Sequence, residues 1–523
     1  MRVQVKLGDR INMRLTDSRS LLICFFVGLG VRFIPELLAF PLPIGFDTIY
    51  YAAVMKNGVI WSYWSTFFTS SWLLYALIVP IYSASRVDPF LLLKVLAPVL
   101  YGLNVAGIYW FARKMLVWDM RRSLLAGGFF VLQLAALRIS WDLLRNVLGL
   151  GILLFALSFI PHLDSRRGSA VFVLLSLLTV FSHEYAAVTL LAIVSALMFW
   201  RLAKERLTTE SKRLALAVSP ALSVFLVGVI LRVFPLQLTV ETNVVNAGDF
   251  IHAHPGGLFF LVDYFSVKSA LDFYATYWNL ALSVLALFGL LYLSYLFLIL
   301  KGFFGNHVLN AWTGLLLAGA FGCLVVPFCA LEYWHRWMFM LVYPFAFYAV
   351  NGLCAFVRKF DGGNIRPLSI FSDRKTKAMV LLTASLGVAY LFTPVLMTCA
   401  GVSVSSAPAT RVYFSTSPTV PYEDVNGVVK AMEWLDQNLD GGSCAVLQRA
   451  FLDWGRLYFD KSHVIVRFET DVNKAVNVAL NQGFSRVFFV WWNTDIGWYG
   501  VKVPDYFVRL QDFGRISVYL YTA

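Results

Sequence analysis

Long apolar runs separated by short polar loops make up the chain as far as about residue 402. Runs of this length and composition predict membrane-spanning helices, and the chain contains about eleven of them. They are residues 21–38, 89–112, 123–139, 143–160, 169–182, 185–200, 214–234, 276–300, 309–329, 337–356 and 378–400. The pattern therefore predicts a polytopic α-helical membrane protein.

The long loop after the first span has a pattern of its own. Residues Phe46–Ile60 have the apolar spacing of an amphipathic helix, which predicts a helix lying at the membrane interface. A second apolar run, Ser71–Ser83, is short and contains Pro80. We interpret it as an interfacial or re-entrant helix, because an extra span here would reverse the sidedness of the basic loop that follows.

After residue 402 the pattern changes to alternating helical and strand-like stretches, which predicts a small α/β domain. We therefore divide the chain into a membrane domain, 1–402, and a second domain, 403–523. The predicted helices are Glu423–Leu439, Phe451–Phe459, Val472–Gln482 and a short one near Tyr506. The predicted strands are Cys444–Leu447, Val464–Phe468, Arg486–Trp492 and Ile516–Tyr521.

Charge gives the expected orientation. The chain has 43 Lys and Arg against 30 Asp and Glu, and the basic residues gather in alternate loops, such as Arg201–Arg206. Basic loops stay in the cytoplasm, so we expect a cytoplasmic N-terminus and an extracytoplasmic C-terminal domain in the plasma membrane. The basic stretch Arg2–Arg19 before Leu21 is interpreted as part of an uncleaved signal anchor. Because the excess charge lies in short inner loops, we expect contacts with membrane lipids and none with nucleic acid.

Acidic residues occur at the opposite ends of the helices from these basic loops. Asp47 lies in the sequence GFDTIYY, at the start of the amphipathic stretch. It has two compatible interpretations, a helix N-cap or a general base that deprotonates an acceptor hydroxyl. Asp142 and Arg145 form a second site in SWDLLRN, where they could instead make an ion pair at a helix start.

Two further polar groups are predicted at the same depth. His183 and Glu184 in FSHEYAAV interrupt an apolar stretch and lack the second histidine of a zinc protease. Glu332, His335 and Arg336 in EYWHRW begin a late span. Arg336 is either an interfacial anchor or a ligand for a phosphate, for which guanidinium offers paired donors and a permanent charge, and His335 could assist it.

The order of these motifs resembles the GT-C superfamily of membrane glycosyltransferases: GFDTIYY in the first outer loop, the basic turn ARKMLVWDMRRSLLAG, SWDLLRN, HEY, HRW and an outer α/β domain. The resemblance implies a GT-C-like fold and transfer of a sugar from a polyprenyl- or dolichyl-phosphate donor. It implies that Asp47 is the base or helps to place a metal. It further implies that Arg336 holds the donor phosphate, and the remaining candidate substrate-binding residues are His335, Arg145, Asp142, His183, Glu184, Tyr50, Tyr51 and Glu332.

Several functions remain open at this stage. The leading one is inverting transfer of a lipid-phosphate sugar to a glycan, lipid or protein acceptor. An oligosaccharyltransferase-like enzyme would need Mg²⁺ or Mn²⁺, held by Asp47 with Asp142 and Glu184. The stretch Phe451–Gly455 only partly matches the WWDYG motif of those enzymes. A transporter or flippase of lipid-linked intermediates, or a non-catalytic scaffold, are the alternatives from other classes.

Overall fold

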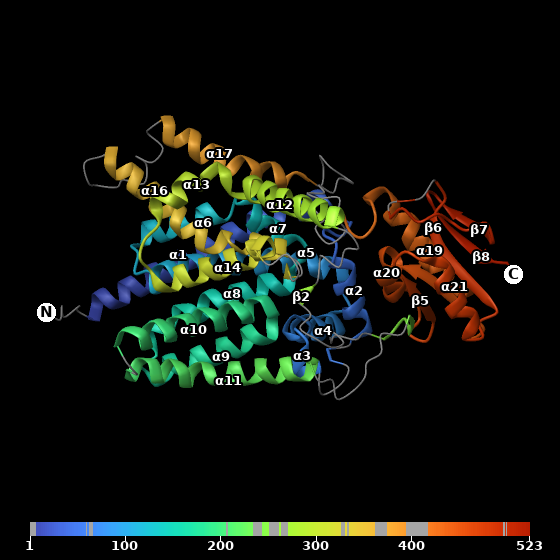
Figure 1. Ribbon diagram of the computed structural model, residues 1–523, viewed down its shortest axis with the longest axis horizontal. Helices are drawn as coiled ribbons and strands as arrows, with labels where there is room; N and C mark the ends of the chain where they lie inside the picture. The colour runs from blue at the N-terminus through green and yellow to red at the C-terminus, as the bar shows by residue number, and fades with distance from the viewer. Residues whose placement is uncertain are drawn as a thin grey trace.

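The computed structural model has an elongated helical body with an α/β unit at one end (Figure 1). It describes residues 7–58, 60–61, 66–205, 208–233, 243–249, 261–262, 270–325, 330–331, 334–360, 374–393, 417–494, 497 and 499–522. We call the end of the body that meets the α/β unit its domain end. The N-terminus lies at the opposite end of the molecule (Figure 1).

Long apolar helices build the body. Among the described residues eight spans are long and apolar enough to cross a membrane, or nine if one bent helix pair counts as a span. The helices are α1 (Leu7–Leu38), α5 (Pro89–Lys114), α6 (Met120–Phe130), α7 (Leu134–Asp142), α8 (Leu144–Ser158), α9 (Arg166–Ser182), α10 (Glu184–Glu205), α11 (Thr209–Val233), α12 (Ala270–Tyr292), α13 (Leu296–Gly302), α14 (His307–Val325), α15 (Trp334–Met340), α16 (Val342–Phe360) and α17 (Arg374–Leu391). The protein is thus a multi-pass membrane protein, as predicted.

Each of the eleven predicted spans falls on helical structure, but three do not have the predicted form. The span predicted at 123–139 is the bent pair α6 and α7, whose axes differ by 63°. The span at 169–182 is α9, which has 17 residues, and in the span at 378–400 the described helix α17 ends at Leu391. The bend matters for function because it brings the end of α7, with Asp142, to the domain end.

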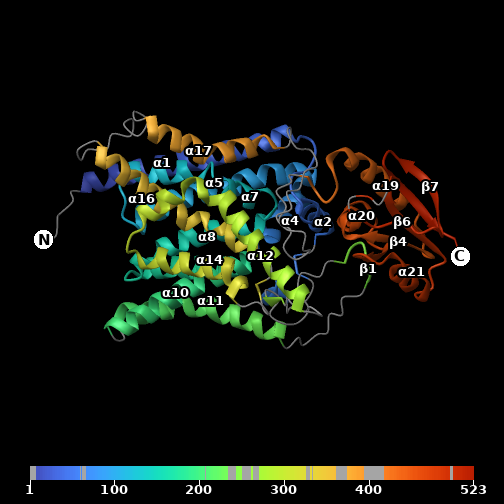
Figure 2. The ribbon, with the colours of Figure 1, turned by 45° about the horizontal axis from the view of Figure 1, so that its top comes forward.

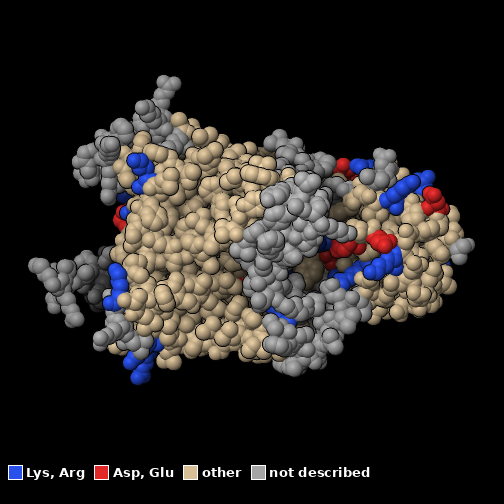
Figure 3. Space-filling view, viewed as in Figure 1, with Lys and Arg blue, Asp and Glu red and all other residues tan. Residues whose placement is uncertain are grey.

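Uncharged side chains cover the body, as expected for a surface that faces lipid. In the view of Figure 3 the described side chains along its length are almost all neither acidic nor basic. Lys and Arg are seen at the end of the body away from the α/β unit, and both basic and acidic side chains are seen on and beside that unit. A basic end of the body is what the positive-inside pattern of the loops predicts.

A buried asparagine joins three helices of the body. The Asn104 side chain on α5 donates to the Val147 carbonyl on α8, at 2.9 Å, and its Oδ1 accepts from the Tyr343 hydroxyl on α16, at 2.8 Å. Asn104 is 1% exposed. Because a buried amide loses several hydrogen bonds if its partners move, this junction fixes the relative positions of three helices.

Three short helices follow α1: α2 (Thr48–Asn57), α3 (Thr66–Thr69) and α4 (Leu73–Ser85). Helices α2 and α4 confirm the two short helices predicted in this loop, whereas α3 was not predicted and α2 is not amphipathic. Eight of its ten residues are buried, because it lies between the body and helix α20 (Arg449–Tyr458) of the α/β unit. Figure 2 shows α2 and α4 at this junction. The apolar spacing thus reflected burial on several sides and not a lipid-facing stripe.

The α/β unit contains a six-stranded sheet of order β1-β5-β4-β6-β8-β7. Its strands are β1 (Val244–Asn246), β4 (Ser443–Gln448), β5 (Val464–Phe468), β6 (Arg486–Trp492), β7 (Phe507–Phe513) and β8 (Ile516–Tyr521). Strand β4 is parallel to β5 and β6, and the remaining pairs are antiparallel. Helices η5 (Tyr422–Asp424), α19 (Val425–Asn438), α20 and α21 (Val472–Asn481) complete the unit. Two residues each form β2 (Leu261–Val262) and β3 (Ala330–Leu331), a separate pair.

The predicted α/β elements are confirmed with one exception. The short helix near Tyr506 was wrong, because this region leads into strand β7. Five of the seven β7 residues are exposed, so this edge strand has no alternation of apolar and polar positions that would have identified it. Strand β1 was also not predicted. It comes from the long loop after α11 and pairs with β5, so the sheet is not made from the C-terminal residues alone.

Candidate functional site

A tight turn places Asp47 at the start of α2. Gly45 has φ +89°, and a Cβ at this position would lie 2.6 Å from the Asp142 Cβ. The Phe46 amide donates to Asp142 Oδ2, at 3.2 Å. Asp47 occupies the predicted N-cap position, but its side chain makes no capping hydrogen bond. The turn instead presents the Asp47 carboxylate, which is half-buried, at the domain end of the body.

Asp142 is buried and holds this turn. Its carboxylate pairs with Arg138 one helical turn earlier, at 2.6 Å, and not with Arg145 as the i,i+3 interpretation would have it. The same carboxylate accepts the Phe46 amide, so it links α7 to the turn that carries Asp47. Through these contacts Asp142 orients the turn that carries Asp47.

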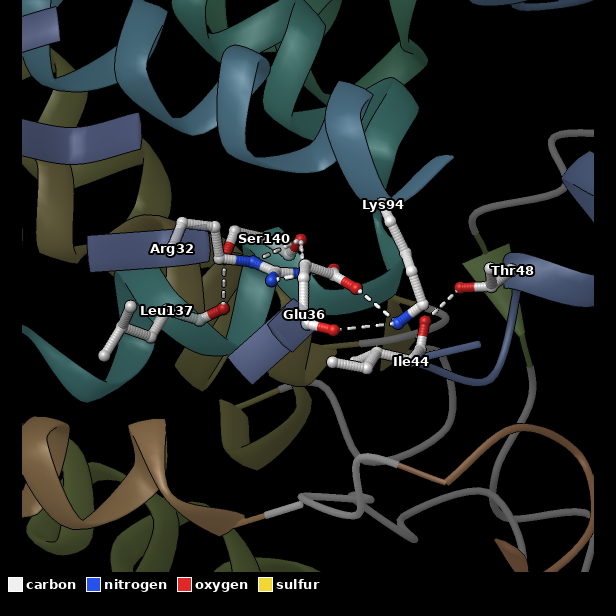
Figure 4. Close-up of polar contacts among 7 residues, drawn as sticks. All are labelled: Arg32, Glu36, Ile44, Thr48, Lys94, Leu137 and Ser140. Carbon is white, nitrogen blue, oxygen red and sulfur yellow. Dashed lines mark hydrogen bonds and ion pairs between the residues drawn. The ribbon is translucent and has the colours of Figure 1, made fainter. Parts of the chain in front are cut away.

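A network of buried charges holds α7 in turn (Figure 4). Arg32 on α1 donates to the Ser140 hydroxyl, at 3.0 Å, and to the Ser140 carbonyl, at 3.1 Å. Glu36 lies 2.8 Å from Arg32 and 3.2 Å from Lys94 on α5. The Arg32 side chain is 0% exposed. Buried charges are tolerated when paired in this way, so the network fixes α1, α5 and α7 below the site.

Arg145 lies among tyrosines at the start of α8. Its guanidinium carbon is 5.8 Å from the centre of the Tyr75 ring, and the Tyr50 and Tyr51 rings lie 6.4 and 6.3 Å from Tyr75. Burial raises the pKa of the Tyr50 and Tyr51 hydroxyls, so both remain protonated and can donate hydrogen bonds. The predicted residues Tyr50, Tyr51 and Arg145 therefore form one cluster.

The HEY segment connects two parts of the domain end. Glu184 Oε1 lies 3.0 Å from the Arg232 guanidinium of α11, which also donates to the Thr69 carbonyl of α3. The His183 ring lies 5.1 Å from Tyr185, and Tyr185 lies 5.2 Å from Trp337, beside Arg336 on α15. Glu184 is thus ion-paired with Arg232, whereas His183 packs against the aromatic side chains next to Arg336.

Charges from four separate elements act on Asp47. Burial first, and then the neighbouring Asp142 carboxylate, raise the pKa of Asp47 above its usual value. Three guanidiniums act in the opposite direction, those of Arg336, Arg145 and Arg449. The structure therefore brings together residues that are hundreds of positions apart in the chain. Arg449 was not among the predicted residues, because nothing near it in the sequence resembles a motif.

The remaining predictions concern the EYWHRW segment and the metal-binding carboxylates. Glu332 lies outside the described residues, while His335 and Arg336 are half-buried in the first turn of α15. The carboxylates proposed for Mg²⁺ or Mn²⁺ do not gather, because Asp142 and Glu184 are each paired with an arginine. Within the described parts of the chain no three His, Cys, Asp or Glu residues form a metal-binding group. The residues present thus do not fit the predicted metal set.

Asn146, in the predicted SWDLLRN segment, is a buried polar side chain near this cluster. It is 1% exposed, and among the described residues neither its Oδ1 nor its Nδ2 has a hydrogen-bond partner. A buried amide in this state costs free energy unless a ligand or water satisfies it. Its donor and acceptor atoms suit a hydroxyl-rich ligand.

Three solved structures are similar to the chain. The arabinofuranosyltransferase AftD from Mycobacteria has a TM-score of 0.51 and 13% identity, over 96% of this chain and 41% of that protein. ArnT from Cupriavidus metallidurans, in the apo state, has a TM-score of 0.49 and 9% identity, over 98% of both chains. The Archaeoglobus fulgidus oligosaccharyltransferase, tethered to an acceptor peptide, has a TM-score of 0.46 and 13% identity, over 91% of this chain and 69% of that one.

No family model and no curated protein matches the sequence. At this identity the likeness to AftD concerns the fold, and it extends over nearly the whole of the present chain. The predicted architecture, a multi-pass helical body with a small α/β unit, is thereby confirmed.

Proposed function

We propose that the protein is an inverting membrane glycosyltransferase that transfers a sugar from a polyprenyl- or dolichyl-phosphate donor to an acceptor at the domain end. Asp47 is the general base, and Arg336 and Arg145 bind the donor phosphate. The acceptor is a glycan, lipid or protein hydroxyl. The observation that carries this proposal is the convergence of Asp47 with arginines from separate helices at one end of the body.

The charge balance around Asp47 supports an anionic substrate. Among the described residues, the guanidiniums that interact with Asp47 are those of Arg138, Arg145, Arg336 and Arg449, against the carboxylates of Asp47 and Asp142. Several guanidiniums thus converge near Asp47. A lipid monophosphate released by transfer carries up to two negative charges, and guanidiniums suit such a leaving group.

The proposed chemistry is a single displacement. Asp47 takes the proton of the acceptor hydroxyl while the acceptor oxygen bonds to the anomeric carbon. The bond between that carbon and the phosphate oxygen breaks, and the lipid phosphate leaves with the electron pair. Because the guanidiniums meet the charge that develops on this oxygen, they stabilise the transition state more than the bound donor. Attack opposite the leaving group inverts the anomeric carbon.

The orientation supports an extracytoplasmic reaction. Lys and Arg occupy the end of the body away from the α/β unit (Figure 3), which is the cytoplasmic end by the positive-inside rule. We therefore place the α/β unit and Asp47 on the outer side. AftD is an arabinofuranosyltransferase, and the shared fold supports the same class of reaction here.

The test is to incubate the purified protein with polyprenyl-phosphate sugars and to measure the lipid phosphate released. Asp47→Asn removes the base, and we expect activity to fall about a thousandfold, within the range for loss of a general base. Folding should persist, because the Asp47 side chain does not cap α2.

Asp88→Asn is the matched control. Asp88 caps α5 by accepting from the Leu91 amide, at 3.0 Å, and asparagine caps a helix equally well. Its activity should therefore equal that of the unmodified protein. If Asp47→Asn kept more than about a tenth of the activity, Asp47 would not be the base. If no polyprenyl-phosphate sugar were consumed, the proposed donor class would be wrong.

A further inference from the structure

Helix α20 of the α/β unit packs beside α2 with its carboxyl end at the carboxyl end of α2. The Asn57 side chain donates to the Arg456 carbonyl, at 3.1 Å, and Lys56 donates to the Leu457 carbonyl. Lys461, just after α20, donates back to the Asn57 carbonyl, at 3.1 Å. Both helices have ten residues and pack against each other, so they run parallel and their amino ends also lie side by side.

Asp47 lies at the amino end of α2, and Arg449 is the first residue of α20. The parallel packing therefore brings Arg449 to the side of Asp47. The electrostatics agree, because the Arg449 guanidinium lowers the pKa of Asp47. The same packing explains why Asp453, one turn further along α20, acts on Tyr50 of α2.

The sheet fixes the backbone at Arg449. This residue directly follows β4, at the carboxyl ends of the parallel strands, which is the edge where open α/β sheets bind ligands. The Gln448 side chain accepts from the Ala450 amide, at 2.6 Å, and donates to the Glu469 carbonyl, at 3.1 Å. The Arg449 side chain itself is exposed, so it lies on the water-facing side of the site.

We infer that the α/β unit forms part of the active site and that Arg449, brought beside Asp47 by the packing of α20 on α2, is a positioning residue that favours the charged form of the Asp47 carboxylate. This inference rests on the proposed function for the reaction, although the ionisation of Asp47 itself does not. It assigns the unit a direct electrostatic role in addition to covering the membrane part.

Other charged groups face Asp47 from the elements packed around it. They are Asp142 and Arg138 on α7, Arg145 on α8, Arg336 on α15 and Tyr51 on α2. All of these come from the body, whereas Arg449 belongs to the α/β unit. Replacing it changes the charge at Asp47 without altering the ion pair of Asp142.

The experiment compares Arg449→Gln with the unmodified protein across pH. Loss of the cation raises the pKa of Asp47, so a larger fraction is protonated at a given pH. The acid limb of the kcat/KM profile should therefore move to higher pH, by about half a unit for an exposed arginine. The shift should shrink at about 1 M salt, because exposed charges are screened. Arg449→Lys should restore the limb.

Arg486→Gln is the matched control, an exposed arginine in the same unit that pairs with Asp440 at 3.0 Å. It should leave the acid limb unchanged. Infrared titration of the Asp47 carboxyl band, identified as the band lost in Asp47→Asn, gives a readout that needs no turnover. An unmoved band in folded Arg449→Gln would overturn the inference. A moved band in a protein that transfers no sugar would uphold it and refute the proposed function.

Discussion

Two kinds of carboxylate occur at the domain end of the body. Asp142 and Glu184 each have an arginine within 3.0 Å; Asp142 links α7 to the turn before α2, and Glu184 links α10 to α11. Several arginines on separate elements act electrostatically on the Asp47 carboxylate, which makes no capping hydrogen bond to its own helix. A carboxylate paired with a close cation stabilises the fold, whereas a carboxylate without such a pair can accept a proton. The sequence alone does not distinguish Asp47 from Asp142 and Glu184.

The largest structural effect that tests this contrast is expected at Asp142. Asp142→Asn leaves the Arg138 charge buried and without its carboxylate, which should lower the free energy of unfolding by about 3 kcal/mol. Asp47→Asn should change that free energy by less than about 0.5 kcal/mol, because its carboxylate has no such partner role. Titration from mild detergent into dodecyl sulfate measures both values.

A double-mutant cycle provides the control for this prediction. Asp142→Asn combined with Arg138→Gln removes both charges, so the combined loss should be smaller than the sum of the two single losses. Additive losses would mean that Asp142 and Arg138 do not stabilise each other. In that case Asp142 would return to the group of candidate substrate-binding residues.

The sequence was sufficient for much of the fold. Long apolar runs located the helices of the body, and short apolar runs located β4, β5, β6 and β8. The edge strand β7 was missed because exposure on both faces removes the alternation that identifies a strand. The apolar spacing of α2 was misinterpreted, because periodicity cannot distinguish lipid from protein as the covering layer.

The site was predicted only in part, for a different reason. Asp47, Arg145 and Arg336 stand out in the sequence because charge is rare next to apolar spans. Arg449 lies in an ordinary soluble helix, where arginine is common, and only the parallel packing of α20 on α2 brings it to Asp47. The sequence also does not show which arginine pairs with Asp142. Its carboxylate pairs with Arg138, four residues earlier, and not with Arg145, three residues later.

The turn that separates Asp47 from Asp142 offers a second test of the contrast. Gly45→Ala introduces a Cβ 2.6 Å from the Asp142 Cβ at a φ of +89°, so the turn must shift. We expect a cost of about 2 kcal/mol in the free energy of unfolding, from the left-handed backbone and the clash. Because Asp47 moves with the turn, activity should fall at least tenfold even in the folded protein.

Gly58→Ala separates the two causes. Gly58 also has a positive φ, +72°, but nothing lies within 4 Å of an added Cβ. It should therefore show the backbone cost of about 1 kcal/mol and keep its activity. Equal activity losses in the two variants would show that the close approach of Gly45 to Asp142 does not position Asp47.

The smallest effect is expected at Glu184, which tests whether a paired carboxylate also has a chemical role. Glu184→Gln removes the charge opposite Arg232, but the guanidinium keeps its bond to the Thr69 carbonyl, and glutamine can still accept a hydrogen bond. The free energy of unfolding should therefore fall by about 1 kcal/mol, and kcat/KM should change less than about threefold. Arg232→Gln, which loses both contacts, should be the less stable of the two. If Glu184→Gln instead lost as much activity as Asp47→Asn while remaining folded, Glu184 would act on the substrate. The distinction between structural and reactive carboxylates would then not follow from ion pairing.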